Sequence, residues 1–287
     1  MTSETEQSMQ VWPAPAKLNL FLHITGRRPD GYHDLQTLFQ ILDWGDDLRF
    51  IVNDSGRISR SVELDSVPES EDICLRAAHL LKSRAGVKQG VKIDLVKRIP
   101  MGAGLGGGSS DAATVLCALN RLWACGMTNG QLAALGLELG ADVPVFVNGF
   151  SAWAEGRGEK LQAVSLGARY YVLVFPGIKI STADVFCHES LKRDSAQVQS
   201  AMFEPDRGRN DCEMVALLMY PELEKVIEDM SEWGRPRMSG TGSTFFLSFD
   251  HKKTAINAAS ELECRYNVRL VGGVDRSGLL DRLSEEL

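Results

Sequence analysis

A run of glycines between two regular elements constrains this chain more than any other feature. Five of the eleven residues from Pro100 to Ser110 are glycine, and the run lies between a predicted strand and a predicted helix. Glycine has no Cβ, so several backbone N–H groups of such a loop can converge on one anion. A helix start adds unpaired N–H donors and the positive end of its dipole. The pattern predicts a phosphate-binding loop.

The elements on both sides of the loop follow from hydrophobic periodicity. Val91, Ile93 and Leu95 alternate with neighbours of different polarity, which is typical of a strand with one wet face. Apolar residues then recur at helical spacing over 112–123. The segment Ser109–Asp111 is expected to supply the cap and the first turn of that helix. The loop therefore ends at a helix N-terminus.

Two other anion-binding loops resemble this one superficially. Gly102, Gly104 and Gly107 satisfy G-x-G-x-x-G, but a dinucleotide-binding fold needs a doubly buried first strand and an acidic residue after the second strand. Here the strand is half polar and a second helix follows the first. A Walker loop needs a lysine before Ser109 or Ser110, and the loop has none. A glycine cluster without a ligand is the remaining alternative, which its position between two ordered elements disfavours.

Composition excludes several classes of function. The 287 residues carry a net charge of −7 without a basic stripe, so nucleic acid is not an expected partner. No apolar run reaches the ~18–20 residues that cross a bilayer, and residues 1–10 lack the features of a secretory signal. We expect a cytoplasmic protein with a frayed N-terminal tail. The six cysteines form no C-x-x-C pair, which favours reduced thiols, several of them in the core.

The remaining pattern alternates between strands and helices. Strands are predicted over 19–24 and 48–52, on both sides of a turn-rich segment, 25–33. Asp72 precedes a helical pattern, and the spacing of Thr128 and Gln131 predicts a capping box for a helix over 130–139 that ends before Gly140. The half-polar strands favour an α+β sandwich over a doubly wound sheet. Further strands are predicted over 171–175, 245–249 and 268–272, and further helices over 181–191, 211–230 with a break near Pro221, and 252–266.

The loop Pro100–Ser110 resembles the phosphate loop of the GHMP kinases, the superfamily of galactokinase, homoserine kinase and mevalonate kinase. Pro15–Asn19 and Ser239–Ser243 resemble two more of its motifs, in the same order along the chain. Within the superfamily, the segments Ala16–Leu22, Arg28–His33 and Gly140–Pro144 resemble the branch that phosphorylates a cytidine-diphosphate-linked methylerythritol. The likeness extends over most of the chain.

This resemblance implies both a fold and a reaction. The implied fold has an N-terminal ribosomal-protein-S5-like α/β domain, placed at 11–160, and a C-terminal α+β domain at 161–287, with the active site in the cleft between them. The implied reaction transfers the γ-phosphoryl group of ATP to the 2-hydroxyl of the cytidyl substrate, a step of the non-mevalonate isoprenoid pathway. Mg²⁺ is expected to accompany ATP, with no protein ligand assigned. The expected partner is this small molecule, and the chain is expected to be a monomer or a weak homodimer.

The resemblance assigns two catalytic residues. Asp142 becomes the general base, and it stands before Val143 and Pro144, which hold it in a rigid setting. Lys17 becomes the cation that stabilises the transferring phosphoryl group. An aspartate that only caps backbone N–H groups and a surface lysine are the alternatives that the residues alone leave open.

Binding residues are implied in the same way. Asn19 should hydrogen-bond the substrate, Tyr32 and His33 should contact the cytidine, and Phe186 should form a second stacking wall. Phe186 could equally be a core residue. Lys97 resembles an adenine-side contact, although a solvent-facing lysine remains open. The implied ATP-binding set is Lys97, Pro100, Met101, Gly102, Ala103, Gly104, Leu105, Gly106, Gly107, Gly108, Ser109 and Ser110, and a side chain at Gly106 or Gly107 is expected to block ATP without unfolding the chain.

Three rival functions remain. Another GHMP kinase could act on a different small alcohol, as homoserine- or mevalonate-type kinases do, and Tyr32 with His33 argues against it. A nucleotide sensor without catalysis would not need both Lys17 and Asp142. A dinucleotide oxidoreductase is disfavoured by the half-polar strand before the loop.

Overall fold

The computed structural model describes residues 10–62, 68–200 and 203–285, so nearly all of the expected N-terminal tail lies outside the described residues. A ten-stranded sheet runs through the molecule, with the order β3-β4-β2-β10-β7-β9-β8. Strand β1 also pairs with β2, and β5 joins β2 to β6. Every pairing of named strands is antiparallel except that of β3 with β4. Among the described residues no helix has the length and apolar character needed to cross a membrane.

The elements have the following bounds. The strands are β1 (Trp12–Arg27), β2 (His33–Asn53), β3 (Ile58–Arg60), β4 (Gly90–Val96), β5 (Ala152–Gly156), β6 (Lys160–Ala163), β7 (Arg169–Phe175), β8 (Arg237–Met238), β9 (Phe245–Phe249) and β10 (Asn267–Val274). The α-helices are α2 (Ile73–Ala85), α3 (Gly107–Leu122), α4 (Asn129–Leu139), α5 (Val143–Asn148), α6 (Thr182–Cys187), α7 (Asp211–Met219), α8 (Leu223–Ser231), α9 (Lys252–Leu262) and α10 (Gly278–Ser284).

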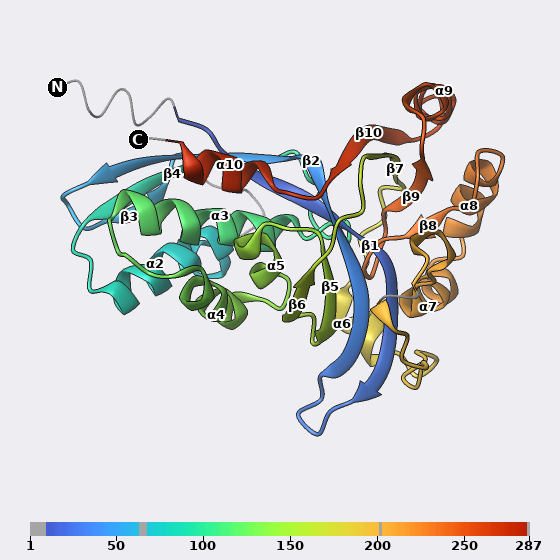
Figure 1. The fold of residues 1–287 in the computed structure, drawn as a ribbon, viewed down its shortest axis with the longest axis horizontal. Helices are drawn as coiled ribbons and strands as arrows, with labels where there is room; N and C mark the ends of the chain where they lie inside the picture. The colour runs from blue at the N-terminus through green and yellow to red at the C-terminus, as the bar shows by residue number, and fades with distance from the viewer. Residues whose placement is uncertain (1–9, 63–67, 201–202, 286–287) are drawn as a thin grey trace.

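The long hairpin of β1 and β2 connects the two halves of the molecule (Figure 1). Strand β2 pairs with β5 near its start, with β10 in its middle and with β4 near its end. Strand β1 follows β2 with register shifts after Pro15, Asn19 and Ile24. Such irregularities bend a strand and redirect its side chains. In Figure 1 the hairpin runs between the helices α2–α5 on one side and α7–α9 on the other.

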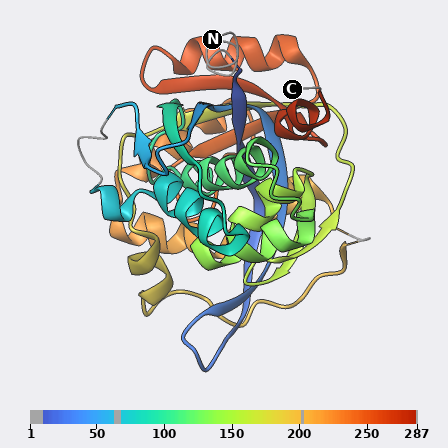
Figure 2. The same cartoon turned by 90° about the vertical axis from the view of Figure 1, so that its left-hand side faces the viewer.

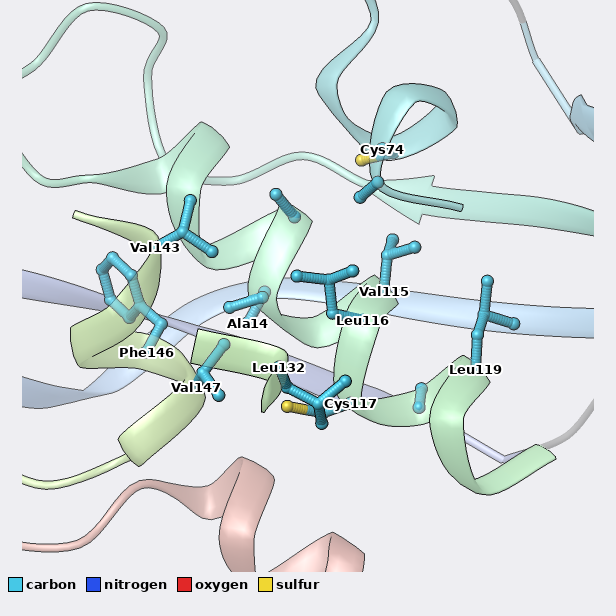
Figure 3. Packing of buried hydrophobic residues seen from close by; sticks show 14 of the residues in the cluster. Ala14, Cys74, Val115, Leu116, Cys117, Leu119, Leu132, Val143, Phe146 and Val147 are labelled. Carbon is cyan, nitrogen blue, oxygen red and sulfur yellow. The ribbon is translucent and has the colours of Figure 1, made fainter. Parts of the chain in front are cut away.

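The first core lies between the sheet and the helices α2–α5, which cover one face of it (Figure 2). Helix α3 is buried along most of its length, and Figure 3 shows its Val115 and Leu116 among side chains of neighbouring elements, including Phe146 of α5. Leu279 of α10 also belongs to this core, so the end of the chain packs on the N-terminal half. Helix α3 is therefore fixed on several sides, and the loop before it has a rigid base.

A second core lies under the helices α6–α9 and includes residues of β7, β9 and β10. Leu22 and Ile24 of β1 are part of it. Each half thus contributes a segment to the core of the other. The division at residues 160 and 161 falls inside β6 and stays a prediction, because one sheet continues through both halves.

Several predicted elements are confirmed. Asp72 caps α2 by accepting from the backbone N–H groups of Cys74 and Leu75. The capping box of Thr128 and Gln131 is present at α4, and a break at Pro221 separates α7 from α8. The strands over 171–175, 245–249 and 268–272 also form, as β7, β9 and β10.

Other predicted bounds are wrong. Strands β1 and β2 extend well beyond 19–24 and 48–52, which shortens the turn between them, because pairing along the whole hairpin supports residues that lack strand periodicity. The helices predicted over 181–191 and 252–266 end earlier, at Cys187 and Leu262. Helix α3 begins at Gly107 with Gly106 as its N-cap, so Ser109–Asp111 lie inside its first turn.

Gly45 tests how closely β1 and β2 must approach. A Cβ there would lie 2.1 Å from the carbonyl oxygen of Ala14 and 2.6 Å from Cα of Pro15, both backbone atoms. We predict that Gly45→Ala lowers the free energy of unfolding by about 1–3 kcal/mol, as overpacking does. Urea unfolding monitored by circular dichroism measures it.

The matched control is Gly130→Ala in the first turn of α4, where an added Cβ meets nothing within 4 Å. This variant should be as stable as the wild type or more stable by up to ~1 kcal/mol. Equal stability of the two variants would contradict the close approach at Gly45.

Candidate active site

Lys17 lies on β1 and is almost completely buried, with 3% of its side chain exposed. Its ammonium lies 3.3 Å from Oδ2 of Asp142, donates to the carbonyl oxygen of Gly104 at 3.2 Å, and donates to Oδ1 of Asn19. Asn19 lies on the same strand face, because successive side chains alternate across a strand. A buried ammonium needs such acceptors. Lys17 therefore joins β1, the glycine loop and the segment that carries Asp142.

Asp142 stands between α4 and α5, at the N-cap position of α5. Its side chain makes no capping hydrogen bond to that helix and instead faces Lys17. A third of the side chain, 33%, is exposed. The alternative that Asp142 serves only as a cap therefore does not hold, and its carboxylate can reach a ligand.

The glycine loop has the backbone of an anion site. Gly102, Gly104 and Gly106 all adopt left-handed conformations, with φ of 70°, 75° and 70°. Left-handed residues that alternate with ordinary ones turn their N–H groups toward one side. Helix α3 follows at once and is 16 residues long, so its N-terminal N–H groups add to the donors. This backbone can hold phosphate.

The third motif, Ser239–Ser243, packs directly on this loop. The hydroxyl of Ser239 donates to the carbonyl oxygen of Gly104 at 2.9 Å and accepts from the backbone N–H of Asn19 at 3.1 Å. A Cβ on Gly104 would lie 2.1 Å from the Ser239 carbonyl oxygen, so only glycine fits there. The three sequence motifs thus meet at one point.

Lys97 is held between two buried carboxylates. Its ammonium lies 2.5 Å from Oδ2 of Asp46 and 2.7 Å from Oδ2 of Asp111. Burial opposes its charge, but Asp111 and Asp46 outweigh burial and raise the pKa of Lys97. Burial also raises the pKa of Asp111, to about 7. Since a Cβ on Gly107 would lie 3.0 Å from the ammonium, this fixed cation stands beside the start of α3.

The predicted cytidine-binding residues form a separate group. Tyr32 is 53% exposed, whereas His33 is 8% exposed and stacks on the ring of Phe186 with centroids 5.4 Å apart. Nε of Arg193 donates to Nε2 of His33 at 3.1 Å, so the neutral ring carries its proton on Nδ1. Burial first, then the charges of Arg193 and Arg27, lower the pKa of His33 and keep it neutral.

A cavity of about 590 Å³ collects most of the predicted site. Ser110 is buried and does not line it, and neither do Tyr32 and His33. Phe186 lines the cavity and also packs against the second core, so both readings of this residue hold. The predicted residues in the wall are Lys17, Asn19, Lys97, Pro100, Met101, Gly102, Ala103, Gly104, Leu105, Gly106, Gly107, Gly108, Ser109, Asp142 and Phe186.

Several residues of the wall were missed from the sequence. Arg157 comes from the turn between β5 and β6, and Thr182 and Thr241 approach each other across the cavity wall, with hydroxyl oxygens 3.0 Å apart. Arg193, which fixes His33, lies in a polar stretch without a recognisable pattern. No local signal marks these residues, because each acquires its partner only through the tertiary fold.

Comparisons with known proteins agree with this geometry. The family models described as GHMP kinases N terminal domain and GHMP kinases C terminal match residues 72–150 and 187–268. A "4-diphosphocytidyl-2-C-methyl-D-erythritol kinase" from Alkalilimnicola ehrlichii is 50% identical over 275 residues, which cover 96% of this chain and 94% of the relative.

Solved structures agree as well. A crystal structure of 4-(cytidine 5'-diphospho)-2C-methyl-D-erythritol kinase matches with a TM-score of 0.79 at 36% identity, covering 92% of this chain and 99% of that one. A homoserine kinase from Cytophaga hutchinsonii, with a TM-score of 0.69 at 16% identity, covers 94% and 97% and shares the fold alone. The expected two-domain GHMP kinase architecture is confirmed.

Gly108 is the position at which a side chain tests the loop most cleanly. Gly106 and Gly107 are less suitable than the sequence indicates, because a Cβ would lie 2.9 Å from the Phe146 ring or 3.0 Å from Ile99. A Cβ on Gly108 meets only Ile73, at 3.8 Å. We predict that Gly108→Val weakens ATP binding by at least about tenfold, because the side chain blocks charge-assisted hydrogen bonds. Calorimetry measures the affinity.

Thermal unfolding supplies the control for this prediction. Gly108→Val should melt near the wild-type temperature, whereas Gly106→Val should melt lower because its φ of 70° strains a β-branched residue. Gly130→Val, in the first turn of α4, should leave ATP binding unchanged. Wild-type ATP affinity in folded Gly108→Val would show that phosphate binds elsewhere.

Proposed function

The chain belongs to the GHMP kinases, within the family of 4-diphosphocytidyl-2-C-methyl-D-erythritol kinases, and from this premise we propose that it phosphorylates the 2-hydroxyl of that cytidyl alcohol with ATP. The observation that carries the proposal is the contact between Lys17 and Asp142, 3.3 Å apart in the wall of the cavity that the glycine loop also lines. A phosphate donor and an alcohol acceptor can meet there.

The nucleotide is bound through its phosphates. The N–H groups of the loop and of the first turn of α3 converge on the phosphate oxygens, and the dipole of α3 adds to their attraction. Lys97 adds a fixed positive charge beside Gly107, which Asp46 and Asp111 hold in place. These groups fix the γ-phosphoryl group relative to Lys17.

The acceptor hydroxyl is activated by Asp142. Its carboxylate accepts the hydroxyl proton while the new O–P bond forms and the bond between the β- and γ-phosphates breaks, so ADP leaves. Lys17 offsets the negative charge on the transferring group, and Gly104 and Asn19 hold its ammonium in position. Because the transition state of phosphoryl transfer is loose, positioning by Lys17 carries much of the effect.

The cytidine is bound near the Tyr32–His33 turn. His33 offers Nδ1–H as a donor to an acceptor on the pyrimidine edge, because Arg193 occupies its Nε2. Tyr32 and Phe186 offer aromatic faces for stacking. Cytosine presents ring N3 and carbonyl acceptors, so its chemistry fits this donor.

Mg²⁺ would enter with ATP and neutralise charge on the phosphates. Within the described residues no group of three or more His, Cys, Asp or Glu side chains is arranged to hold a metal. This fits Mg²⁺, which keeps several waters and is bound largely by substrate phosphates. Ser109, in the cavity wall and in the first turn of α3, would hold it on the protein side.

A coupled ADP-release assay against a panel of alcohols tests this function. The cytidyl alcohol should give the highest kcat/KM, above homoserine and mevalonate, because only it uses the Tyr32–His33 turn. A higher value with homoserine or mevalonate would favour the alternative of another GHMP kinase. The expected monomer or weak homodimer stays a prediction.

Asp142→Asn isolates the base, since the amide keeps the size of the side chain but cannot take the proton. We predict that kcat falls by about 10² to 10⁴ while ATP affinity stays nearly unchanged. Lys17→Met should also lower kcat, and the double variant should lose less than the product of the two single effects, because both residues act on one transition state. Asp281→Asn on α10 is the control. Near-wild-type turnover of Asp142→Asn at saturating substrates would rule out the general base.

Tyr32→Ala and His33→Ala test the cytidine contacts. Each should raise KM for the cytidyl alcohol more than KM for ATP, by about 1–3 kcal/mol for a lost stacking contact. The pKa of His33 is lowered, so the wild-type KM should stay constant at neutral pH and rise only as pH falls below about 6.5, where the ring gains its second proton. Steady-state kinetics from pH 5.5 to 8 measure both, at roughly half-unit steps. Equal changes in the two KM values would contradict the assignment.

A further inference from the structure

Arg157 stands at the tip of the hairpin that β5 and β6 form. The tip is tightly held, because Gly156 and Gly158 adopt positive φ of 74° and 108° and the backbone N–H of Arg157 donates to Oε2 of Glu159 at 2.5 Å. Gly156 pairs with Leu35 of β2, so the tip lies beside the start of the strand that carries His33. The side chain of Arg157 lines the active-site cavity.

Arg157 differs from the other cations of the cavity wall. Lys17, Lys97 and Arg60 each pair with a carboxylate, at distances of 3.3, 2.5 and 2.8 Å from Asp142, Asp46 and Asp72. The structure gives the guanidinium of Arg157 no carboxylate partner anywhere in the described part of the chain. The wall thus contains one cation whose charge is not already neutralised.

The donors of Arg157 are also unused. Its Nε is buried without a hydrogen-bond partner among the described residues, a state that is costly for an N–H donor. Its guanidinium instead lies over the ring of Tyr32, 3.8 Å from the centroid. A cation over an aromatic face is held in orientation without losing its hydrogen-bonding edge. The geometry therefore presents free donors between Tyr32 and the cavity.

We propose that Arg157 binds the diphosphate group that joins the cytidine to the acceptor alcohol. The inference rests on the proposed function. Guanidinium matches phosphate oxygens in a bidentate manner. The contacts also follow the order of the substrate, since Arg157 touches Tyr32, at the cytidine end, and lines the same cavity as Asp142, at the hydroxyl end. The glycine loop already serves the phosphates of ATP, so this second anion needs its own cation.

Calorimetry with CDP, cytidine and ATP on the full chain tests the proposal. Wild-type protein should bind CDP more tightly than cytidine, and this difference should shrink as ionic strength rises. Arg157→Gln should weaken CDP binding at least about tenfold, while the affinities for cytidine and ATP change by less than about twofold. Arg157→Lys keeps the charge and should recover part of the CDP affinity.

The matched control is Arg276→Gln, because the Arg276 guanidinium also lies over a ring, that of Phe150 at 5.9 Å, but outside the cavity. It should bind CDP as the wild type does. Equal losses for CDP and cytidine in Arg157→Gln would overturn the proposal and leave Arg157 as a support for Tyr32. A selective loss of ATP affinity would overturn it in favour of a nucleotide contact. Wild-type protein that binds neither CDP nor cytidine would instead contradict the proposed function itself.

Discussion

The buried ammonium of Lys17 is the interaction on which the site depends. A cation with 3% of its side chain exposed is tolerated only where acceptors surround it, and here they come from Asn19, Gly104 and Asp142. These residues belong to β1, to the glycine loop and to the segment between α4 and α5. Satisfying one charge therefore fixes three segments that are distant in the sequence, and it places the phosphate site next to the base.

The rest of the fold keeps this arrangement rigid. Helix α3, whose N-terminus completes the loop, is buried along most of its length between the sheet and the surrounding helices. Ser239 holds Gly104 from the other side and also accepts from the backbone of Asn19, so the C-terminal half of the chain takes part in the site. Donors that are fixed before the reaction need no reorganisation during it, which is how such sites lower a barrier. The continuous sheet, with β2 pairing into both halves, preserves these distances.

The sequence predicted what local chemistry determines. The glycine run identified the anion loop because the need for positive φ limits the residue type, and the spacing of Thr128 and Gln131 identified a helix start. The roles of Lys17 and Asp142 came from family resemblance, since the residues alone could not separate a base from a cap; the missing capping bond in the structure separates them. The long pairing of β1 with β2, the carboxylates around Lys97, and the positions of Arg157 and Arg193 could not be predicted, because each depends on partners that only the tertiary fold supplies.

The position of the transferred phosphate tests the central claim most directly. ATP and the cytidyl alcohol are incubated with wild-type protein and with Asp142→Asn, and the products are followed by phosphorus NMR with carbon coupling. The account predicts a new phosphomonoester coupled to the carbon that bears the 2-hydroxyl, formed in step with ADP by the wild type and far more slowly by the variant. A phosphate on another hydroxyl, or ADP release without a new phosphomonoester, would contradict it.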